Sequence, residues 1–237
     1  MKIQVVILAG GVGSRMKVDR PKQFIEVNDV PVIVRTIQNF QRNTRITGIT
    51  VVCIKDWLSY LQKLVNKYNL TKVTEIVEGG ATGHDSTRNG IYSLREKLQD
   101  DDFVIIHDAA RPLIPQSIIN KMLDKAFEYG NACTAIPIHE TIILTDDQIS
   151  GNSEIDRSRI MRVQTPQAYR YGLIYPLYKK ADEENLHNFI YANTMAIHYG
   201  TRLYFSDGFN SNVKITTPQD IAFYKALLQF NEEDLAK

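Results

Sequence analysis

The sequence predicts an α/β fold of the Rossmann-like type: an open, mostly parallel sheet with helices on both faces and a β-hairpin arm. Short apolar runs rich in Val and Ile alternate with segments of helical periodicity along the first half of the chain. This alternation is typical of right-handed βαβ units. A glycine-rich turn directly follows the first apolar run, which is where an open sheet of this kind binds its ligand.

The predicted strands are apolar runs bounded by turn residues, as expected for parallel strands covered on both faces. They span residues 3–8, 49–54, 73–77 and 103–106. Between them, apolar residues recur at helical spacing and predict amphipathic helices, with faces at 32–40, 58–68, 91–98 and 118–127. The loops after the first, third and fourth strands are therefore expected to meet at the carboxyl edge of the sheet.

The second half of the chain departs from this alternation between residues 138 and 164. An apolar run at 141–145 leads into polar turn residues, which predicts a hairpin-like insertion rather than another βαβ unit. Helices are predicted from Leu173 to about Asn185, from about Phe189, and from Pro218 to about Phe230. The tail from 231 to 237 is expected to fray.

Bulk composition predicts one domain over residues 1–237 in the cytoplasm. A chain of 237 residues with 43% hydrophobic content can bury a sizeable core. Its 28 basic and 27 acidic residues leave a net charge of +1, which argues against nucleic acid or an anionic membrane as a partner. No apolar run approaches the roughly 20 residues of a membrane helix. Cys53 and Cys133 lie in apolar runs without metal-ligand spacing, so we expect buried thiols in a reducing compartment.

The glycine-rich turn predicts a cradle for a polyphosphate. Val5-Val6-Ile7-Leu8 runs into Ala9-Gly10-Gly11-Val12-Gly13-Ser14-Arg15-Met16, and Pro21-Lys22-Gln23 follows. Glycines let backbone N–H groups approach a bulky anion closely, and Arg15 and Lys22 would add positive charge where phosphates react. The plainer alternative is that both cations are solvated on a surface turn.

Two familiar phosphate-binding motifs do not fit this turn. A Walker loop requires a lysine directly after its second conserved glycine, where this chain has Ser14. A dinucleotide fingerprint requires a third glycine where Met16 stands. The fingerprint also needs an acidic residue after the second strand, where this chain has Lys55. An oxidoreductase on a Rossmann sheet is therefore disfavoured.

Six further ordered motifs narrow the class. They are Pro21-Lys22-Gln23, Gly79-Gly80 with Ser86, His107-Asp108-Ala109-Ala110-Arg111-Pro112, Asp156-Arg157, Thr165-Pro166-Gln167 and Asn212-Val213-Lys214-Ile215-Thr216. With the glycine turn, this order and spacing resembles one cytidylyltransferase family of the sugar-nucleotide pyrophosphorylase type. The family contains methylerythritol-phosphate and ribitol-5-phosphate cytidylyltransferases. The resemblance runs from about Ile3 to about Leu228.

The resemblance implies an enzyme that joins CMP from CTP to a phosphorylated polyol, releases pyrophosphate, uses Mg²⁺, and forms a homodimer through the arm. It assigns catalysis to Arg15, Lys22 and Lys214. It assigns nucleotide binding to Leu8, Ala9, Gly10, Gly11, Gly13, Gly79, Gly80, Ser86 and Asp108. It assigns the second substrate to Arg157, Thr165, Ile190, Tyr191 and Lys214, and the metal to Asp108.

Local chemistry leaves several of these roles with alternatives. A carboxylate at a strand end, as at Asp108, suits Mg²⁺, which accepts few carboxylates together with phosphate oxygens and water. His107 has no ligand-spaced partner, so we interpret it as a hydrogen-bonded strand-end residue, and Arg111 as structural support for Asp108. Ser86 could read the nucleotide or cap a helix. Arg157 and Lys214 could instead form solvated ion pairs.

Three departures from the family pattern bear on the substrate. Gly83 stands where most members have an arginine, and Arg88 lies five residues further on. Ile190-Tyr191 replaces the Thr-Asp pair of the methylerythritol-phosphate enzymes, and Ser211 replaces an aspartate. The lost pair favours an alditol phosphate as the acceptor, with ribitol 5-phosphate first and methylerythritol phosphate as the alternative. A nucleotide-binding protein without turnover is the competing hypothesis from another class.

Overall fold

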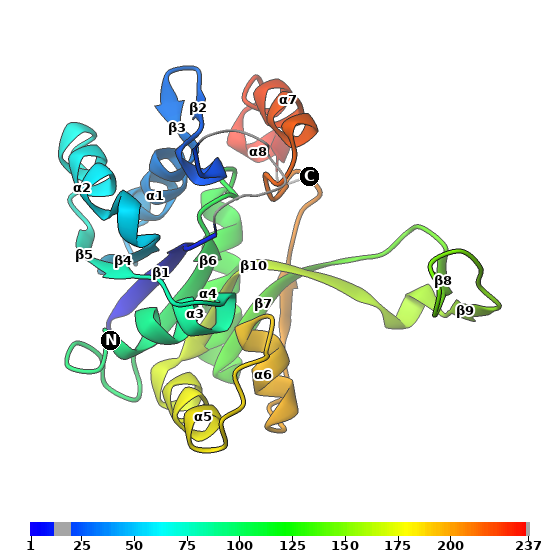
Figure 1. The fold of residues 1–237 in the computed structure, drawn as a ribbon. Helices are drawn as coiled ribbons and strands as arrows, with labels where there is room; N and C mark the ends of the chain where they lie inside the picture. The colour runs from blue at the N-terminus through cyan, green and yellow to red at the C-terminus, as the bar shows by residue number, and fades with distance from the viewer. Residues whose placement is uncertain (12–19, 236–237) are drawn as a thin grey trace.

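The computed structural model describes residues 1–11 and 20–235, in which a central seven-stranded sheet carries helices on both faces (Figure 1). The spatial order of the strands is β11-β7-β10-β6-β1-β4-β5. Their bounds are β1 (Ile3–Ala9), β4 (Gly48–Cys53), β5 (Val73–Glu78), β6 (Phe103–Asp108), β7 (Asn131–Pro137), β10 (Met161–Arg170) and β11 (Phe205–Asp207).

The central strand β1 marks a change in the direction of winding. β1 pairs in parallel with β4 on one side and with β6 on the other, and β4 pairs in parallel with β5. The chain therefore winds outward from β1 to β5 and then returns to β6, which leaves a crevice outside the carboxyl ends of β1 and β6. Leu8 at the end of β1 lies in register with Asp108 at the end of β6. The predicted Rossmann-like fold is confirmed, with β10 as an antiparallel strand between β6 and β7.

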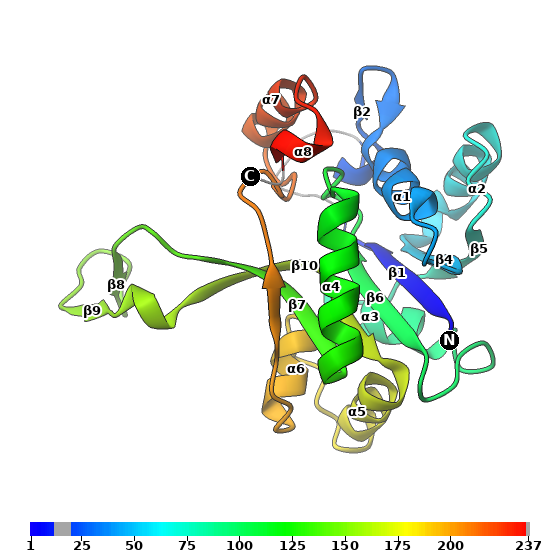
Figure 2. The same cartoon turned by 180° about the vertical axis from the view of Figure 1, so that it is seen from behind.

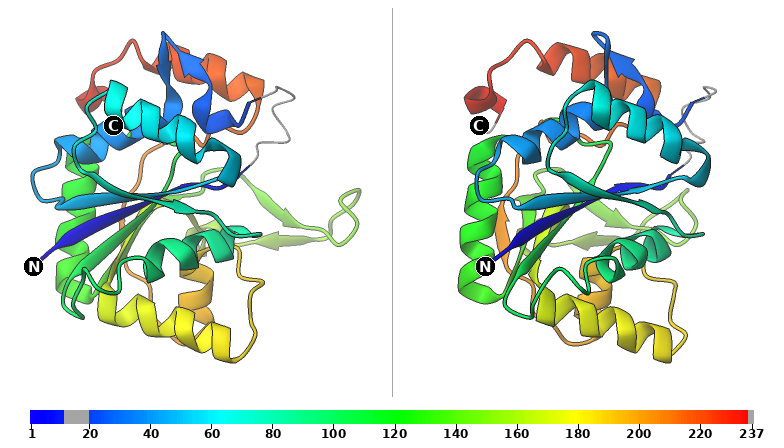
Figure 3. Two further views of the ribbon diagram at one scale, coloured as in Figure 1. Left: turned by 60° about the vertical axis from the view of Figure 1, so that its left-hand side comes forward. Right: turned by 90° about the vertical axis from the view of Figure 1, so that its left-hand side faces the viewer.

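Two groups of helices cover the faces of the sheet, as the side views in Figure 3 show. On one face lie α1 (Val32–Arg42), α2 (Leu58–Lys67) and α4 (Gln116–Tyr129), and α4 runs along β7 in Figure 2. The opposite face carries α3 (Gly83–Tyr92), α5 (Tyr171–Glu183) and α6 (Ala192–His198). Alternate side chains of β1 enter the two cores: Val5 and Ile7 pack toward α1 and Val6 toward α3. Within the described residues, no helix is long and apolar enough to cross a membrane.

Local sequence explains where these helices begin and end. Thr82 and Asp85 form a capping box at the start of α3, and Thr217 and Asp220 form one at α7 (Pro218–Leu227). Pro218 opens α7, as predicted. The last turn of α4 is followed by Gly130, whose φ of 82° is accessible to a residue without a Cβ.

The insertion predicted after residue 138 forms a protruding arm (Figures 1 and 2). It consists of the antiparallel pair β8 (Ile142–Leu144) and β9 (Ser153–Ile155), followed by the short helix η4 (Arg157–Arg159). β10 begins at Met161, so the arm ends about four residues earlier than predicted, and Thr165 belongs to the central sheet. Ile143, Leu144 and Ile149 are exposed on the arm.

Other boundaries also differ from the predictions. The helix α3 ends at Tyr92 and is followed by turns, although Leu94 and Leu98 are buried as the periodicity predicted. The helix expected from about Phe189 begins only at Ala192. Four short elements were not predicted: the strands β2 (Glu26–Val27) and β3 (Val30–Pro31), which form a hairpin, and the short helices η2 (Lys22–Phe24) and η3 (Lys55–Trp57).

The prediction that the tail frays is wrong for residues 231–235. The helix α8 (Glu232–Leu235) docks on the fold, because Leu235 is buried and its carbonyl accepts a hydrogen bond of 2.6 Å from the Ser211 hydroxyl. This bond ties the end of the chain to the loop that carries Lys214.

Candidate active site

A pocket of about 630 Å³ lies outside the carboxyl ends of β1 and β6, the position that the strand order predicts. This volume is ordinary for a small-molecule site. Eleven of the predicted site residues line it: Leu8, Gly10, Gly11, Lys22, Gly80, Ser86, Asp108, Thr165, Ile190, Tyr191 and Lys214. Ala9 and Gly79 do not line it, although each is next in sequence to a residue that does. Gly13 and Arg15 lie outside the described residues.

The glycine turn and the loop after β5 meet at Ser86. The Ser86 hydroxyl accepts a hydrogen bond of 3.1 Å from the backbone N–H of Gly80. A Cβ added to Gly10 would lie 2.8 Å from the same hydroxyl oxygen, and one added to Gly80 would lie 2.2 Å from Asp85 Cβ. Both glycines therefore permit backbone approaches that a side chain would block. The alternative of Ser86 as a helix cap is wrong, because Thr82 caps α3.

Gln23 fixes the base of the glycine turn. Its side-chain amide donates hydrogen bonds of 2.7 Å to the carbonyl of Ala9 and 3.1 Å to that of Gly11, and the residue is buried. The neighbouring Lys22 begins the short helix η2 and lines the pocket. The Pro-Lys-Gln motif therefore combines one residue that holds the turn with one that brings a cation to the ligand.

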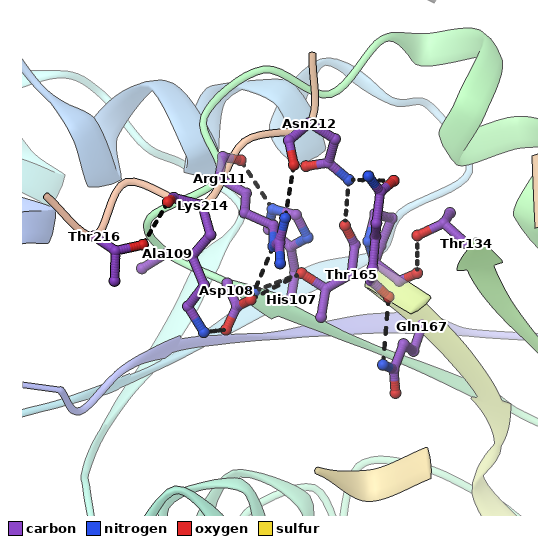
Figure 4. Close-up of polar contacts among 12 residues, drawn as sticks. His107, Asp108, Ala109, Arg111, Thr134, Thr165, Gln167, Asn212, Lys214 and Thr216 are labelled. Atoms are coloured by element: carbon purple, nitrogen blue, oxygen red, sulfur yellow. Dashed lines mark hydrogen bonds and ion pairs between the residues drawn. The ribbon is translucent and has the colours of Figure 1, made fainter. Parts of the chain in front are cut away.

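At the end of β6, Asp108 is paired with two cations (Figure 4). Its Oδ1 accepts a hydrogen bond of 2.9 Å from the Lys214 ammonium, and its Oδ2 accepts one of 3.0 Å from Arg111 Nε. The Thr165 hydroxyl donates to Oδ2 over 3.4 Å. Burial by itself raises the pKa of the Asp108 carboxyl, but Lys214 and Arg111 outweigh it and hold that pKa well below its usual range. The carboxylate is therefore ionised, and the three groups together carry a charge of +1.

A network of buried amides holds the loop that presents Lys214 (Figure 4). Asn212 Nδ2 donates to the carbonyl of Thr165 over 2.8 Å and to Gln164 Oε1 over 3.2 Å. Gln164 Nε2 in turn donates to the carbonyl of Phe209, and Arg111 donates to the carbonyl of Asn212 over 2.6 Å. The loop is thus fixed to β10 and to the β6 turn, which places Lys214 against Asp108.

His107 and the two cysteines have structural roles, as predicted. His107 Nε2 lies 3.0 Å from the carbonyl oxygen of Arg111, and burial lowers the pKa of the imidazole to about 4. His107 is therefore neutral near pH 7. Burial raises the pKa of Cys53 and that of Cys133 to about 12, which makes both thiols unreactive.

The segment between α5 and α6 forms the wall of the pocket opposite the glycine turn. Ile190 and Tyr191 line this wall, and both side chains are exposed. The Lys214 ammonium lies 5.7 Å from the centre of the Tyr191 ring. This wall is therefore an aromatic and apolar surface beside the cationic cluster.

Two arginines that the sequence brought into question do not line the pocket: Arg157, predicted to bind the second substrate, and Arg88, the nearest arginine to Gly83. Arg157 is exposed on the arm, where its guanidinium donates to the carbonyl of His139. Arg88 pairs with Asp182 over 2.9 Å and with Asp85 over 3.4 Å, so its guanidinium does not replace the arginine that is missing at Gly83. An added Cβ at Gly83 would be 3.9 Å from its nearest neighbour, the carbonyl oxygen of Ile190, so the space there is open.

Sequence reasoning missed several residues that build the site. Gln164 was not singled out, although it directly precedes the Thr165-Pro166-Gln167 motif. Its role depends on contacts with Phe209 and Asn212, about 45 residues further along the chain. Thr87 and His187 also line the pocket. In the sequence, the one indication of a role for these residues was that each lies close to a predicted site residue.

The described residues contain no group of three or more His, Cys, Asp or Glu side chains that could hold a metal ion. Asp108 has one oxygen, Oδ1, with a single hydrogen bond, and the residue lines the pocket. A hard cation with few protein ligands is compatible with such a carboxylate.

Comparison with solved structures identifies the class. A structure described as 4-diphosphocytidyl-2C-methyl-D-erythritol synthase from Anaerococcus prevotii superposes with a TM-score of 0.80 at 26% identity, covering 97% of this chain and 99% of that one. A Rossmann-like sheet with this pocket therefore defines a nucleotidyltransferase. The family described as 2-C-methyl-D-erythritol 4-phosphate cytidylyltransferase matches residues 3–230. The chain belongs to this family of cytidylyltransferases.

Two subgroups of relatives are similar over nearly the whole chain. A ribitol-5-phosphate cytidylyltransferase of Lacticaseibacillus paracasei is 37% identical over 232 residues, which are 97% of this chain and 99% of the relative. One of Streptococcus agalactiae is 38% identical, covering 97% and 96%. A 2-C-methyl-D-erythritol 4-phosphate cytidylyltransferase of Clostridium novyi is 36% identical, covering 94% and 95%.

Proposed function

We propose that the protein transfers CMP from CTP to D-ribitol 5-phosphate, forming CDP-ribitol and pyrophosphate. The observation that carries the proposal is the convergence of the glycine turn, Lys22 and the Asp108–Lys214 pair on one pocket at the switch point of the sheet. The relatives named for ribitol 5-phosphate, which are 35–38% identical, support this acceptor. Products of this kind supply wall or capsular polymers.

The chemistry required is an in-line displacement at phosphorus. An oxygen of the acceptor phosphate forms a bond to the α-phosphorus of CTP, and the bond from that phosphorus to the bridging oxygen of the β-phosphate breaks. A phosphate is already nucleophilic at neutral pH, so positioning and charge neutralisation dominate the rate. We assign neutralisation of the triphosphate to Lys22 and Arg15, and orientation of the acceptor phosphate to Lys214 and Thr165.

The nucleotide is proposed to lie against the two glycine segments. Gly10 and Gly11 offer close backbone approach to the phosphates, and Gly80 and Ser86 line the part of the pocket next to α3. The absence of a side chain at Gly83 leaves one phosphate contact of the family pattern unfilled. We therefore expect a weaker hold on the triphosphate rather than a loss of turnover.

We further propose that Mg²⁺ acts at this site, held by Asp108 Oδ1. Mg²⁺ usually binds one or two carboxylates together with substrate phosphates and water. The ion would neutralise charge on the triphosphate as pyrophosphate leaves. Because Ser211 stands where some members have an aspartate and donates to Leu235, the protein would contribute a single carboxylate.

The acceptor wall supports an alditol phosphate over methylerythritol phosphate. Ile190 and Tyr191 lie at the pocket where the alternative acceptor would need a hydroxyl and a carboxylate. A site that lacks these polar groups leaves the corresponding substrate hydroxyls without partners, which costs binding. Methylerythritol phosphate remains the second candidate, since the description of the family and the Asp156-Arg157 motif favour it.

We propose that the protein acts as a cytoplasmic homodimer joined through the arm. Exposed apolar side chains on a protruding hairpin, here Ile143, Leu144 and Ile149, are typical of an interface. Arg157 on the arm would then reach the acceptor phosphate in the pocket of the partner subunit. The buried thiols of Cys53 and Cys133 fit a reducing compartment.

A substrate panel tests the proposal. Pyrophosphate release is measured with CTP and Mg²⁺ against ribitol 5-phosphate, methylerythritol phosphate and other phosphorylated alcohols, with and without EDTA. We expect release with ribitol 5-phosphate at least about tenfold faster than with methylerythritol phosphate, and loss of release in EDTA. Equal turnover of the two acceptors would show that the wall does not select the acceptor. CTP binding without release from any alcohol would favour a protein without turnover.

A further inference from the structure

An aromatic ring and a carboxylate face the same ammonium group in the pocket. Lys214 Nζ lies 2.9 Å from Asp108 Oδ1 and 5.7 Å from the centre of the Tyr191 ring. The ring belongs to the residue before α6, and the carboxylate belongs to the end of β6. The lysine thus bridges two walls of the pocket that come from distant parts of the chain.

The two neighbours of Lys214 stabilise its charge in different ways. Asp108 neutralises the ammonium, so the pair must loosen for the cation to serve an incoming phosphate. The face of an aromatic ring attracts a cation through its quadrupole and carries no net charge. The ring therefore holds the ammonium in the pocket while leaving its full charge for the substrate.

We propose that Tyr191 is a positioning residue whose ring, rather than its hydroxyl, holds Lys214 ready for the acceptor phosphate. The inference rests on the proposed function, because it assumes that Lys214 meets that phosphate. It goes beyond that function by assigning a physical role to one of the residues that replaces the usual polar pair. The prediction is that the ring matters and the phenol oxygen does not.

The geometry supports action through the lysine. Tyr191 is 45% exposed, so water reaches part of the residue. Its backbone is fixed at the start of α6, because the Tyr191 N–H donates to Thr194 Oγ1 and the Thr194 hydroxyl donates to the Tyr191 carbonyl over 2.8 Å. These two bonds hold the backbone that carries the ring. Acceptor binding would remove water around the ring and strengthen its attraction for the ammonium.

Substitutions at Tyr191 separate the ring from the hydroxyl. Tyr191→Phe keeps the ring, and we expect kcat/KM for the acceptor to fall no more than about threefold. Tyr191→Leu removes the ring, and we expect kcat/KM for the acceptor to fall about fivefold to thirtyfold, with little change in KM for CTP. Equal losses in the two variants would overturn the proposal and assign the hydroxyl to substrate binding.

A matched control is available at Tyr129. Lys125 Nζ lies 5.3 Å from the centre of the Tyr129 ring, and Tyr129 is 41% exposed, so the pair resembles that at Tyr191 in distance and exposure. Tyr129 lies at the end of α4, outside the pocket. We expect Tyr129→Leu to leave kcat/KM within about twofold. A loss equal to that of Tyr191→Leu would mean that removing a surface ring acts through general stability.

A double-mutant cycle tests whether the ring acts through Lys214. In a Lys214→Ala background, Tyr191→Leu should change the residual kcat/KM by less than about twofold. Additive losses would overturn the proposal. The same four proteins compared by chemical denaturation without substrate should show a coupling of about twofold to fivefold in the unfolding equilibrium constant.

The denaturation cycle keeps this inference separate from the choice of acceptor. If the wild-type protein turns over an alcohol phosphate other than ribitol 5-phosphate, the proposed acceptor is wrong, and the variants are compared with the alcohol that is used. If none is used, the coupling in unfolding still reports the contact between ring and lysine. Absence of both the coupling and the difference between Phe and Leu would refute the role of Tyr191.

Discussion

Replacing Asp108 with Asn tests the ion-paired cluster at the end of β6 most directly. The substitution keeps one oxygen, places an amide donor opposite the donors of Arg111 and Thr165, and removes the charge that balances Lys214. Lys214 and Arg111 would then lie on either side of an uncharged side chain. We expect both stability and turnover to fall.

The size of the stability loss follows from the burial of the three side chains. Breaking a buried ion pair costs about 3–5 kcal/mol, and one hydrogen bond to a charged group contributes about 1.5–3 kcal/mol. The Asp108 side chain is 11% exposed, and that of Lys214 is 30% exposed, so water relieves part of the cost. We expect a loss of about 2–4 kcal/mol, which lowers Tm by about 4–16 °C for a chain of this length.

The control is Asp207→Asn. Asp207 pairs with Lys121 over 2.9 Å, the same distance as Asp108 to Lys214, but its side chain is 69% exposed. Such surface pairs contribute at most about 1 kcal/mol. Calorimetry near pH 7 compares the two variants, and equal melting temperatures would refute the buried pairing. Because the folded-state pKa of Asp108 is depressed, its contribution is fully present above the unfolded pKa near 4 and is lost as pH falls through the folded value.

Three other predictions follow from the site and the arm. Lys22→Ala should lower kcat about a hundredfold or more with little change in Tm, and full activity would place the chemistry elsewhere. Burial lowers the pKa of His107 to about 4 in the folded protein, whereas the unfolded chain takes up a proton near pH 6.5. The free energy of unfolding should therefore fall by about 2 kcal/mol from pH 7 to pH 5. Urea unfolding of His107→Gln should lack this part of the fall, and an unchanged pH dependence would contradict the assignment. Deleting residues 141–156 should convert a dimer to a monomer in light scattering, and a persistent dimer would exclude the arm as the interface.

The alternation of strands and helices in the first half of the chain was predictable from the sequence. The strand runs at residues 3–8, 49–54, 73–77 and 103–106 are mostly apolar, and each became a strand of the central sheet. The pattern is strongest at β4 and β6, in which every residue is buried, because parallel strands covered on both faces favour apolar residues. The apolar run around Cys133 forms β7. The strand β10 was not foreseen, since its polar residues Gln164 and Gln167 are buried through hydrogen bonds.

The site residues on β1 and β6 were predictable because the register of parallel strands brings their ends together. Leu8 and Asp108 needed only the strand order and the switch-point rule. The contacts of Asp108 with Lys214 and of Gln164 with Asn212 join residues 106 and 48 positions apart. No local pattern encodes such pairs. The docking of Leu235 on Ser211 failed as a prediction for the same reason, because a short polar tail looks frayed until its partner is known.

In the proposed reaction, the cluster of Asp108, Lys214 and Arg111 would exchange one ion pair for another when the second substrate binds. Asp108, Lys214 and Arg111 together carry +1, and the carboxylate pairs with both cations. None of these three is therefore an unpaired buried charge, which would be costly. A phosphate that carries about two negative charges at neutral pH competes with Asp108 for the ammonium. Lys214 also faces the uncharged ring of Tyr191. Its ammonium would therefore move from the carboxylate to the phosphate while the ring continues to stabilise the charge. In the proposed reaction this exchange would place the nucleophile beside the nucleotide at a small cost, because one ion pair replaces another.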